Sequence, residues 1–428
     1  MKLNRFLSWL MFAIVLIAFV DVVRDQIAYS NKLGNQLSHQ ADGGSELASI
    51  NSGMHYYKLG FLINFGLPDL SMPGSKWYID PNDDPISAGV YTHYPPGPNW
   101  MLGIGMHVCG VNNFPCYRKF PIFVGFVCLV LSYICVSRVI GSVLAAAFFL
   151  VLVRIPITTE MMHGLHHQGY AFSIFLLMMS YAWYLFSRER SPTLKEWGGL
   201  FFLGFLIGWL SFDYFFVTSL FPLAIFLLSR SKRSWLEAVK GVTASGGGWC
   251  FAMGLHFIQN ALYFSTGHRA TSWNFTLEKL SRGFSRAYDD LFLSAKIRAG
   301  AIAARPNSSF AEVVELYTGK FLPARTQAGE IGMYMIYAAA VLAVLFLLVS
   351  LIRGHRHGSL RSYAGLGMAM VVAYVISMLW VIVMRDHALD GTHMMFIPRH
   401  FILLIFTSMG VVTTVIMELI KAMGWSRK

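Results

Sequence analysis

Apolar runs long enough to cross a lipid bilayer recur along this chain and constrain its fold more than any other feature. A helical span needs about 20 predominantly apolar residues. Inside lipid, every backbone polar group of such a segment must be satisfied within the protein, which favours helices. Only 13% of the 428 residues are charged, whereas a soluble domain has about a quarter. The sequence therefore predicts an all-α polytopic membrane protein with one integral membrane domain over residues 1–428.

About ten spans account for these runs. The run 197–228 is too long for one ordinary span, and its flanks, 187–196 and 229–233, are both basic. Because basic loops favour the cytoplasmic side, we expect a hairpin of two short helices with its tip near Ser211–Tyr214. A single tilted helix there would invert the predicted membrane orientation of every segment that follows. The predicted spans are 5–24, 119–137, 139–157, 169–187, two within 197–228, 239–265, 329–352, 363–384 and 400–420.

The positive charge of the chain predicts its orientation. The net charge is +12, and much of the excess lies in short loops between spans, which indicates anionic lipid rather than nucleic acid as the partner. The first span lacks a small-x-small cleavage site and is interpreted as a retained signal anchor. Two long loops, 25–117 and 266–328, are then extracytoplasmic. We expect a multi-pass protein of a bacterial inner membrane whose site faces the periplasm or exterior.

Two cysteines lie near the membrane boundary on this external side. Cys109 and Cys116 are separated by a short polar segment, and disulfides persist in oxidising compartments. The pair is therefore either a small disulfide or two unpaired thiols, and the sequence leaves both readings open.

The first long loop carries an acidic segment and a stiff aromatic–proline segment. Asp42 and Glu46 stand four residues apart, so a helix would place both carboxylates on one face. The alternative is that Asp42 only caps that helix. The segment YTHYPPGPNW, at Tyr91–Trp100, combines ring faces with a fixed backbone. The apolar residues Leu47, Ile50, Met54, Tyr57 and Phe61 recur at helical spacing and predict an interfacial helix.

Further ionisable residues gather in short external loops. His163, His166 and His167 follow the third span, and their spacing is compatible either with metal ligation or with a solvated loop. The loop before the last span holds Arg385, His393 and Arg399 among other polar residues. One arginine beside a span is commonly a headgroup anchor, but several together favour phosphate binding. We expect the loops to converge on one face of the bundle.

These features together resemble the GT-C superfamily of membrane glycosyltransferases, which use polyprenyl-phosphate-linked sugars and include protein O-mannosyltransferases, aminoarabinose transferases and lipopolysaccharide glycosyltransferases. The resemblance rests on one span followed by a large external loop, on the acidic segment QADGGSELASINSGMHYYKLG, and on YTHYPPGP. The chain departs from the commonest family pattern, because Gly43 rather than a second acidic residue follows Asp42.

The resemblance implies an inverting transfer of a hexosyl or pentosyl group to a hydroxyl of a glycan, lipid or protein acceptor. By position Asp42 matches the catalytic base, with Glu46 as second choice and Asp21 or Asp25 as alternatives. Substrate contacts would come from His93, Tyr94, His163, His167, Arg385, His393 and Arg399, with Arg154 a further cation for the leaving phosphate. No metal and no cofactor are expected, although some relatives use a divalent ion.

Other classes of function make different predictions. A transporter or flippase of an anionic or lipid-linked substrate would place polar residues in mid-span, within paired halves. The sequence has few mid-span charges and no visible halves. A polysaccharide ligase or polymerase would share the donor chemistry, and the loop 266–328 keeps that alternative open.

Overall fold

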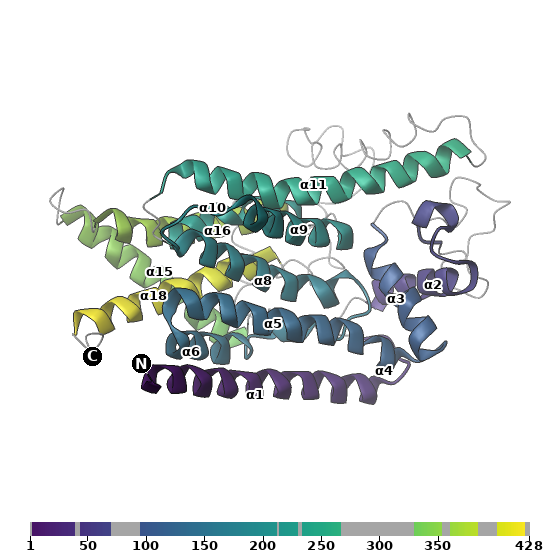
Figure 1. Ribbon diagram of the computed structural model, residues 1–428, viewed down its shortest axis with the longest axis horizontal. Coiled ribbons are helices and arrows are strands. Elements are labelled where there is room, and N and C mark those ends of the chain that lie inside the picture. Colours follow the sequence, from purple (N-terminus) through teal and green to yellow (C-terminus); the bar gives the residue numbers. More distant parts are fainter. Residues whose placement is uncertain are drawn as a thin grey trace, which may run out of the picture.

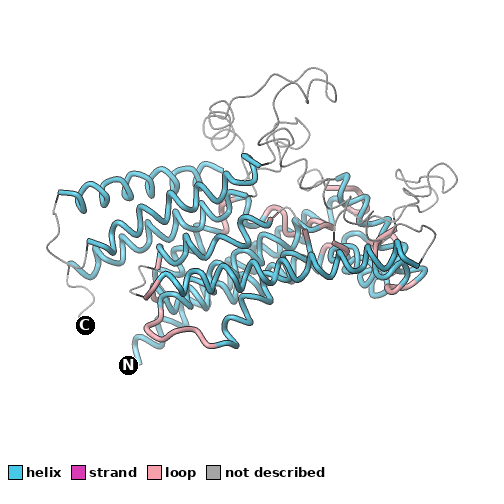
Figure 2. Tube along the Cα trace, turned by 90° about the horizontal axis from the view of Figure 1, so that it is seen from above, coloured by secondary structure: helices cyan, strands magenta, loops and turns pink. Residues whose placement is uncertain are grey.

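A computed structural model describes residues 2–38, 43–69, 95–211, 214–229, 233–266, 329–352, 360–383 and 400–423. Their regular secondary structure is helical, apart from one isolated bridge position at Asp69. The long helices lie roughly side by side along the longest axis, with both termini near one end and the helices of the first loop at the other (Figure 1, Figure 2).

The helices follow the predicted spans closely. Four are long and apolar enough to cross a membrane, over Arg5–Leu33, Phe114–Ile140, His167–Ser187 and Ile402–Lys421. The polytopic all-α prediction is therefore confirmed. The bundle comprises α1 (Lys2–Leu33), α5 (Lys119–Ile140), α6 (Ser142–Leu152), α8 (His167–Ser187), α9 (Leu194–Leu210), α10 (Phe215–Leu228), α11 (Trp235–Thr266), α15 (Gly329–Ile352), α16 (Leu360–Val383) and α18 (Ile402–Ala422).

Two of the predicted boundaries are wrong. Helix α1 continues to Leu33 rather than ending near residue 24. The span expected over 139–157 is only α6, Ser142–Leu152, because Gly141 adopts a positive φ of 82° before it and Pro156 starts a new turn after it. Proline cannot supply the backbone N–H that a continuing helix needs. The result is a short helix followed by a loop and by α7 (Pro156–Thr159).

The predicted hairpin at 197–228 is confirmed. Helix α9 ends at Leu210 and α10 begins at Phe215. The Arg233 guanidinium donates hydrogen bonds to the backbone carbonyls of Leu185, Arg188 and Arg190. The two basic flanks therefore meet at one end of the bundle, as a two-helix hairpin requires.

Helices α9 and α11 approach each other closely along a seam of small residues. A Cβ atom at Gly204 would lie 2.1 Å from the carbonyl oxygen of Ser245, and one at Gly248 would lie 2.0 Å from that of Phe201. Only glycine fits at such backbone contacts, which are common where helices pack in membranes. Elsewhere the core centres on α8, whose Trp183 packs against the rings of Phe148 and Phe406.

The first long loop adds a small helical layer at the end of the bundle opposite the termini (Figure 1). It comprises α2 (Gly43–Leu59), the 3₁₀ turn η1 (Ile63–Gly66), α3 (Gly97–Cys109) and α4 (Phe114–Tyr117). This layer supports the candidate site.

Candidate functional site

The predicted helix in the first loop exists, but it buries a different face from the one expected. Ile50 is buried, whereas Tyr57, from the predicted apolar stripe, is 36% exposed. Glu46 and Tyr56 are fully buried instead. Helix α2 packs against α3, so its position depends on protein contacts as well as on apolar surface. The sequence pattern identified the helix and missed its polar inner face.

A buried carboxylate links four separate segments of the chain. Both oxygens of Glu46, in the first turn of α2, accept hydrogen bonds. The backbone N–H of Ser38 donates to Oε2 at 2.8 Å, the backbone N–H of Leu165 donates to Oε1 at 3.0 Å, and Nη2 of Arg118 donates to Oε2 at 2.9 Å. The side chains of Glu46 and Arg118 are both 0% exposed. We call this group, Ser38, Glu46, Arg118 and Leu165, the hub.

Arg118 extends the hub to the end of α1. Its guanidinium also donates to the carbonyl oxygens of Gly34, at 3.3 Å, and Gln36, at 3.0 Å. Sequence reasoning missed this residue, because an arginine directly before an apolar span is usually read as a headgroup anchor. The one available signal was its place two residues after Cys116, in FPCYRKF. A guanidinium with several acceptors suits a buried junction of this kind.

Opposing effects act on the hub carboxyl. Burial raises the pKa of Glu46 above its usual value, while Arg118 and the two backbone donors lower it. An isolated buried charge would be very costly, so the pair and its hydrogen bonds must be complete for the hub to be stable. Glu46 is thus occupied in holding α2 against the bundle.

His163 is also enclosed by protein contacts. Its side chain is 0% exposed. Nε2 lies 2.7 Å from Oγ of Ser38, and Nδ1 lies 2.8 Å from Oε1 of Gln26. An amide oxygen can only accept, so Nδ1 carries the proton and Nε2 accepts from the Ser38 hydroxyl. Burial, followed by the Arg118 charge, lowers the pKa of His163 to about 3. His163 is a neutral link between α1 and the loop before α8.

Beside the hub, the loop after α7 meets two other segments in a cluster of rings. The centroids of His166 and His167 are 5.0 Å apart, those of His167 and Tyr214 are 6.0 Å apart, and those of Tyr214 and His400 are 5.5 Å apart. Each of the four residues is less than 9% exposed. We call them the histidine–tyrosine cluster. The loop after α7, the hairpin tip and the segment before α18 therefore converge, as the sequence predicted.

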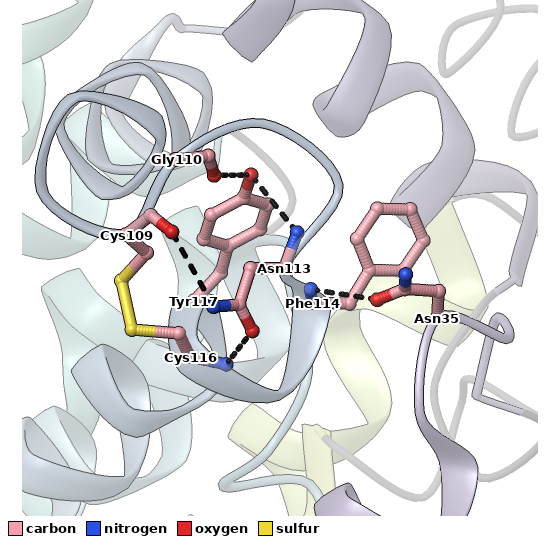
Figure 3. The surroundings of a disulfide bond; sticks show 7 residues. All are labelled: Asn35, Cys109, Gly110, Asn113, Phe114, Cys116 and Tyr117. Atoms are coloured by element: carbon pink, nitrogen blue, oxygen red, sulfur yellow. Dashed lines mark hydrogen bonds between the residues drawn. A yellow bond between two sulfur atoms is a disulfide. The ribbon is translucent and has the colours of Figure 1, made fainter.

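A disulfide fixes the layer next to the hub (Figure 3). Cys109 and Cys116 are paired, with Cα atoms 6.0 Å apart. Asn113 accepts from the backbone N–H of Cys116, and Oη of Tyr117 donates to the carbonyl of Gly110. The structure thus selects the disulfide from the two readings that the sequence left open.

The remaining predicted site residues are not brought into this site. Asp21 and Asp25 lie on α1, pair with Arg24 and have side chains 46% and 66% exposed. Arg154 is exposed at the end of α6. Among the described ranges, no group of three or more His, Cys, Asp or Glu side chains is placed to hold a metal ion. Asp42, His93, Tyr94, Arg385, His393 and Arg399 lie outside the described residues.

Comparison with known proteins yields structural likeness alone. No family model and no curated protein matches the sequence. The fold is similar to that of ArnT from Cupriavidus metallidurans, in a crystal structure bound to undecaprenyl phosphate and in one of the apo state. The TM-scores are 0.42 and 0.40, with sequence identities of 14% and 13%. The alignments cover 94% and 93% of this chain and 77% and 76% of ArnT.

At this identity the likeness assigns no role to any residue of this chain.

Proposed function

We propose that the protein is an inverting membrane glycosyltransferase of GT-C type, which moves a sugar from a polyprenyl-phosphate donor to an acceptor hydroxyl at the external end of the bundle. The observation that carries the proposal is the convergence of loops at that end. The hub and the histidine–tyrosine cluster gather polar groups from the end of α1, the start of α2, the loop before α8, the hairpin tip and the start of α18. Loops held on a rigid scaffold are where catalytic residues usually lie.

The disulfide supports the external orientation of this end. Disulfides are stable in oxidising compartments such as the periplasm and rare in the cytosol. The opposite end carries the basic flanks of the α9–α10 hairpin, joined through Arg233, and basic segments favour the cytoplasmic side. The disulfide at one end and the basic flanks at the other therefore support the same orientation, with the disulfide end external.

In the proposed reaction, the acceptor oxygen attacks the anomeric carbon while the bond from that carbon to the phosphate oxygen breaks. The acceptor proton passes to the carboxylate of Asp42 as general base. Polyprenyl phosphate leaves with the bonding electrons, and inversion follows from attack on the face opposite the phosphate. His93, Tyr94, His167, Arg385, His393 and Arg399 are the proposed contacts to sugar hydroxyls or the leaving phosphate.

The hub gives Glu46 and His163 a supporting role in this proposal. Asp42 precedes α2 by one residue, and Glu46 anchors the first turn of that helix. Catalytic groups must be held within a fraction of an ångström of their productive position. Glu46, Arg118 and His163 are therefore positioning residues, whereas Asp42 is the proposed base.

The experiment is sugar transfer by purified protein in lipid, with radiolabelled sugars on polyprenyl phosphate. Undecaprenyl phosphate, the lipid in one ArnT crystal, is a practical first carrier. We expect Asp42→Asn to lower the rate by about 100-fold or more, the usual contribution of a general base. Glu189→Gln, an acidic residue exposed at the opposite end, is the matched control and should retain the full rate.

Full activity of Asp42→Asn rejects this base. Loss in Asp25→Asn or Asp21→Asn instead relocates the base to α1. A wild-type protein that moves the intact lipid-linked sugar across the bilayer, without transfer, would establish the flippase alternative.

A further inference from the structure

Helix α2 carries another buried polar side chain, away from the hub. His55 is 3% exposed, and its Nε2 has no hydrogen-bond partner in the part of the chain that the structure describes. Its Nδ1 lies 3.9 Å from Oδ2 of Asp69, which is an ion-pair distance rather than a hydrogen bond. A buried imidazole with one nitrogen beside a carboxylate and the other unpaired needs an explanation.

The segment before Asp69 is conformationally strained. Asn64 and Phe65 have φ angles of 51° and 57°, in the left-handed region, which asparagine adopts readily but a bulky residue such as phenylalanine rarely does. Such positions persist only where the surroundings enforce them. Clusters of strain are typical of functional sites.

Three helices hold this strained turn in place. Oη of Tyr56, on α2, and Nε1 of Trp100, on α3, both donate to the carbonyl of Gly66, at 2.7 and 3.0 Å. Nε2 of Gln259, on α11, donates to the carbonyl of Phe65 at 2.9 Å. These three hydrogen bonds fix the course of the chain three residues before Asp69 and so hold its carboxylate beside His55.

The surroundings of His55 determine which of its nitrogens accepts. A carboxylate near Nδ1 favours the proton on that nitrogen, which leaves Nε2 as an acceptor in the neutral ring. One helical turn earlier, Nδ2 of Asn51 is buried and also lacks a partner among the described residues. Residues four apart lie on the same face of a helix. This face of α2 therefore presents one acceptor and one donor close together.

We propose that Asn51 and His55 form a hydroxyl-binding subsite that recognises a sugar. Neighbouring sugar hydroxyls each donate and accept, and they can satisfy a donor and an acceptor on adjacent helical turns. The inference rests on the proposed function and deepens it, because it names two buried side chains that would hold a hydroxyl of the donor or the acceptor. Asp69 is a positioning residue that acts through His55.

Two substitutions at His55 separate binding from packing. In His55→Gln the side-chain amide reaches the region of Nε2, so a polar atom remains there. In His55→Asn the amide occupies the region of Nδ1, keeps the contact with Asp69 and removes the atom at Nε2. We expect His55→Asn to raise the KM for the sugar-bearing substrate by about tenfold with little change in kcat, since one hydrogen bond is lost. The KM of His55→Gln should be close to that of wild type.

Sources of the bound sugar are distinguished by varying the two substrates separately. A KM change confined to the donor assigns the subsite to the transferred sugar, and one confined to the acceptor assigns it to a glycan acceptor. Wild-type KM values for both substrates in His55→Asn would overturn the subsite and leave the proposed function standing.

A binding experiment tests the subsite without catalysis. Purified protein in detergent is heated with methyl glycosides of glucose, galactose or mannose, and separately with inorganic phosphate. We expect at least one glycoside to raise the melting temperature of wild type and His55→Gln but not of His55→Asn. No stabilisation of wild type by any glycoside, or a response to phosphate that His55→Asn abolishes, would overturn a hydroxyl subsite. Glycoside binding by a protein that transfers no sugar would reject the proposed function alone.

Discussion

The two ends of the bundle both contain a glutamate–arginine ion pair, in very different surroundings. At the external end, Glu46 and Arg118 are each 0% exposed. At the basic end, Glu196 pairs with Arg188 and Arg190, whose side chains are 14% and 57% exposed. Buried pairs are costly to break because the remaining charge has no water to solvate it, whereas exposed pairs contribute little. The buried pair of Glu46 and Arg118 therefore stabilises the candidate site, whereas the more exposed pairs of Glu196 lie at the start of α9 and should stabilise it little.

The comparison predicts its largest effect at Arg118. Arg118→Met leaves Glu46 buried without its cation, and removing one partner of a buried pair costs about 3–5 kcal/mol. We expect a strongly reduced yield of folded protein and a large fall in the melting temperature in detergent, measured by loss of helical circular dichroism.

The double variant Glu46→Gln with Arg118→Met sharpens this prediction. It removes both charges, while the glutamine oxygen still accepts from one of the backbone N–H groups of Ser38 and Leu165. Coupled residues show interaction energies of about 0.5–3 kcal/mol, so the double variant should be more stable than Arg118→Met alone. Additive losses would show that the pair is not the unit that stabilises the hub.

The disulfide at the same end should have the next largest effect. Cys109 and Cys116 are 7 residues apart in sequence, and closing a loop of this size in the unfolded chain is worth about 2–3 kcal/mol. Cys116→Ser should lower the melting temperature of oxidised protein, and the same loss should appear in wild type after reduction. The exposed thiol of Cys250 provides the control, because Cys250→Ser should change neither value. Equal stability of oxidised and reduced wild type would contradict the structure here.

The stability of the external end should also depend on pH. His163 has a pKa of about 3 in the folded protein, while an unfolded histidine titrates near about 6.5. As pH falls below that value the unfolded chain takes up a proton that the folded chain does not, so stability falls with pH until about pH 3. At pH 5 the loss is about 2 kcal/mol. His163→Gln, which keeps an oxygen near Ser38, should lose less stability between pH 7 and pH 5 than wild type; an identical loss would contradict a buried neutral histidine.

The sequence predicts the helical bundle better than it predicts the candidate site. The hairpin at 197–228 was predictable because its two basic flanks and its length left one simple topology. The partners of His163 were not, because Gln26 lies 137 residues away and nothing local points to it. From its residue type and loop position His163 was predicted to contact substrate, whereas the structure places both of its ring nitrogens within hydrogen-bond distance of protein groups. Arg118 was missed for the same reason, since burial of a charge depends on Glu46 and on carbonyls 82 and 84 residues earlier.

The smallest predicted effect is at the basic end. Glu196 accepts from the backbone N–H and the hydroxyl of Thr193 in a capping box, and it also accepts from Arg188 and Arg190. These contacts hold the pKa of the Glu196 carboxyl well below its usual range, chiefly through Arg188. Because the group is near the surface and solvent screens its charges, Arg190→Ala should cost only about 0.2–1 kcal/mol and leave sugar transfer unchanged. Since Thr193 and Glu196 cap α9 reciprocally, Glu196→Ala should cost more than Arg190→Ala, by about 1 kcal/mol. Melting curves of the two variants in the same detergent measure that difference. Equal losses would mean that the ion pair, rather than the cap, stabilises this end, and the contrast with the buried hub would then weaken.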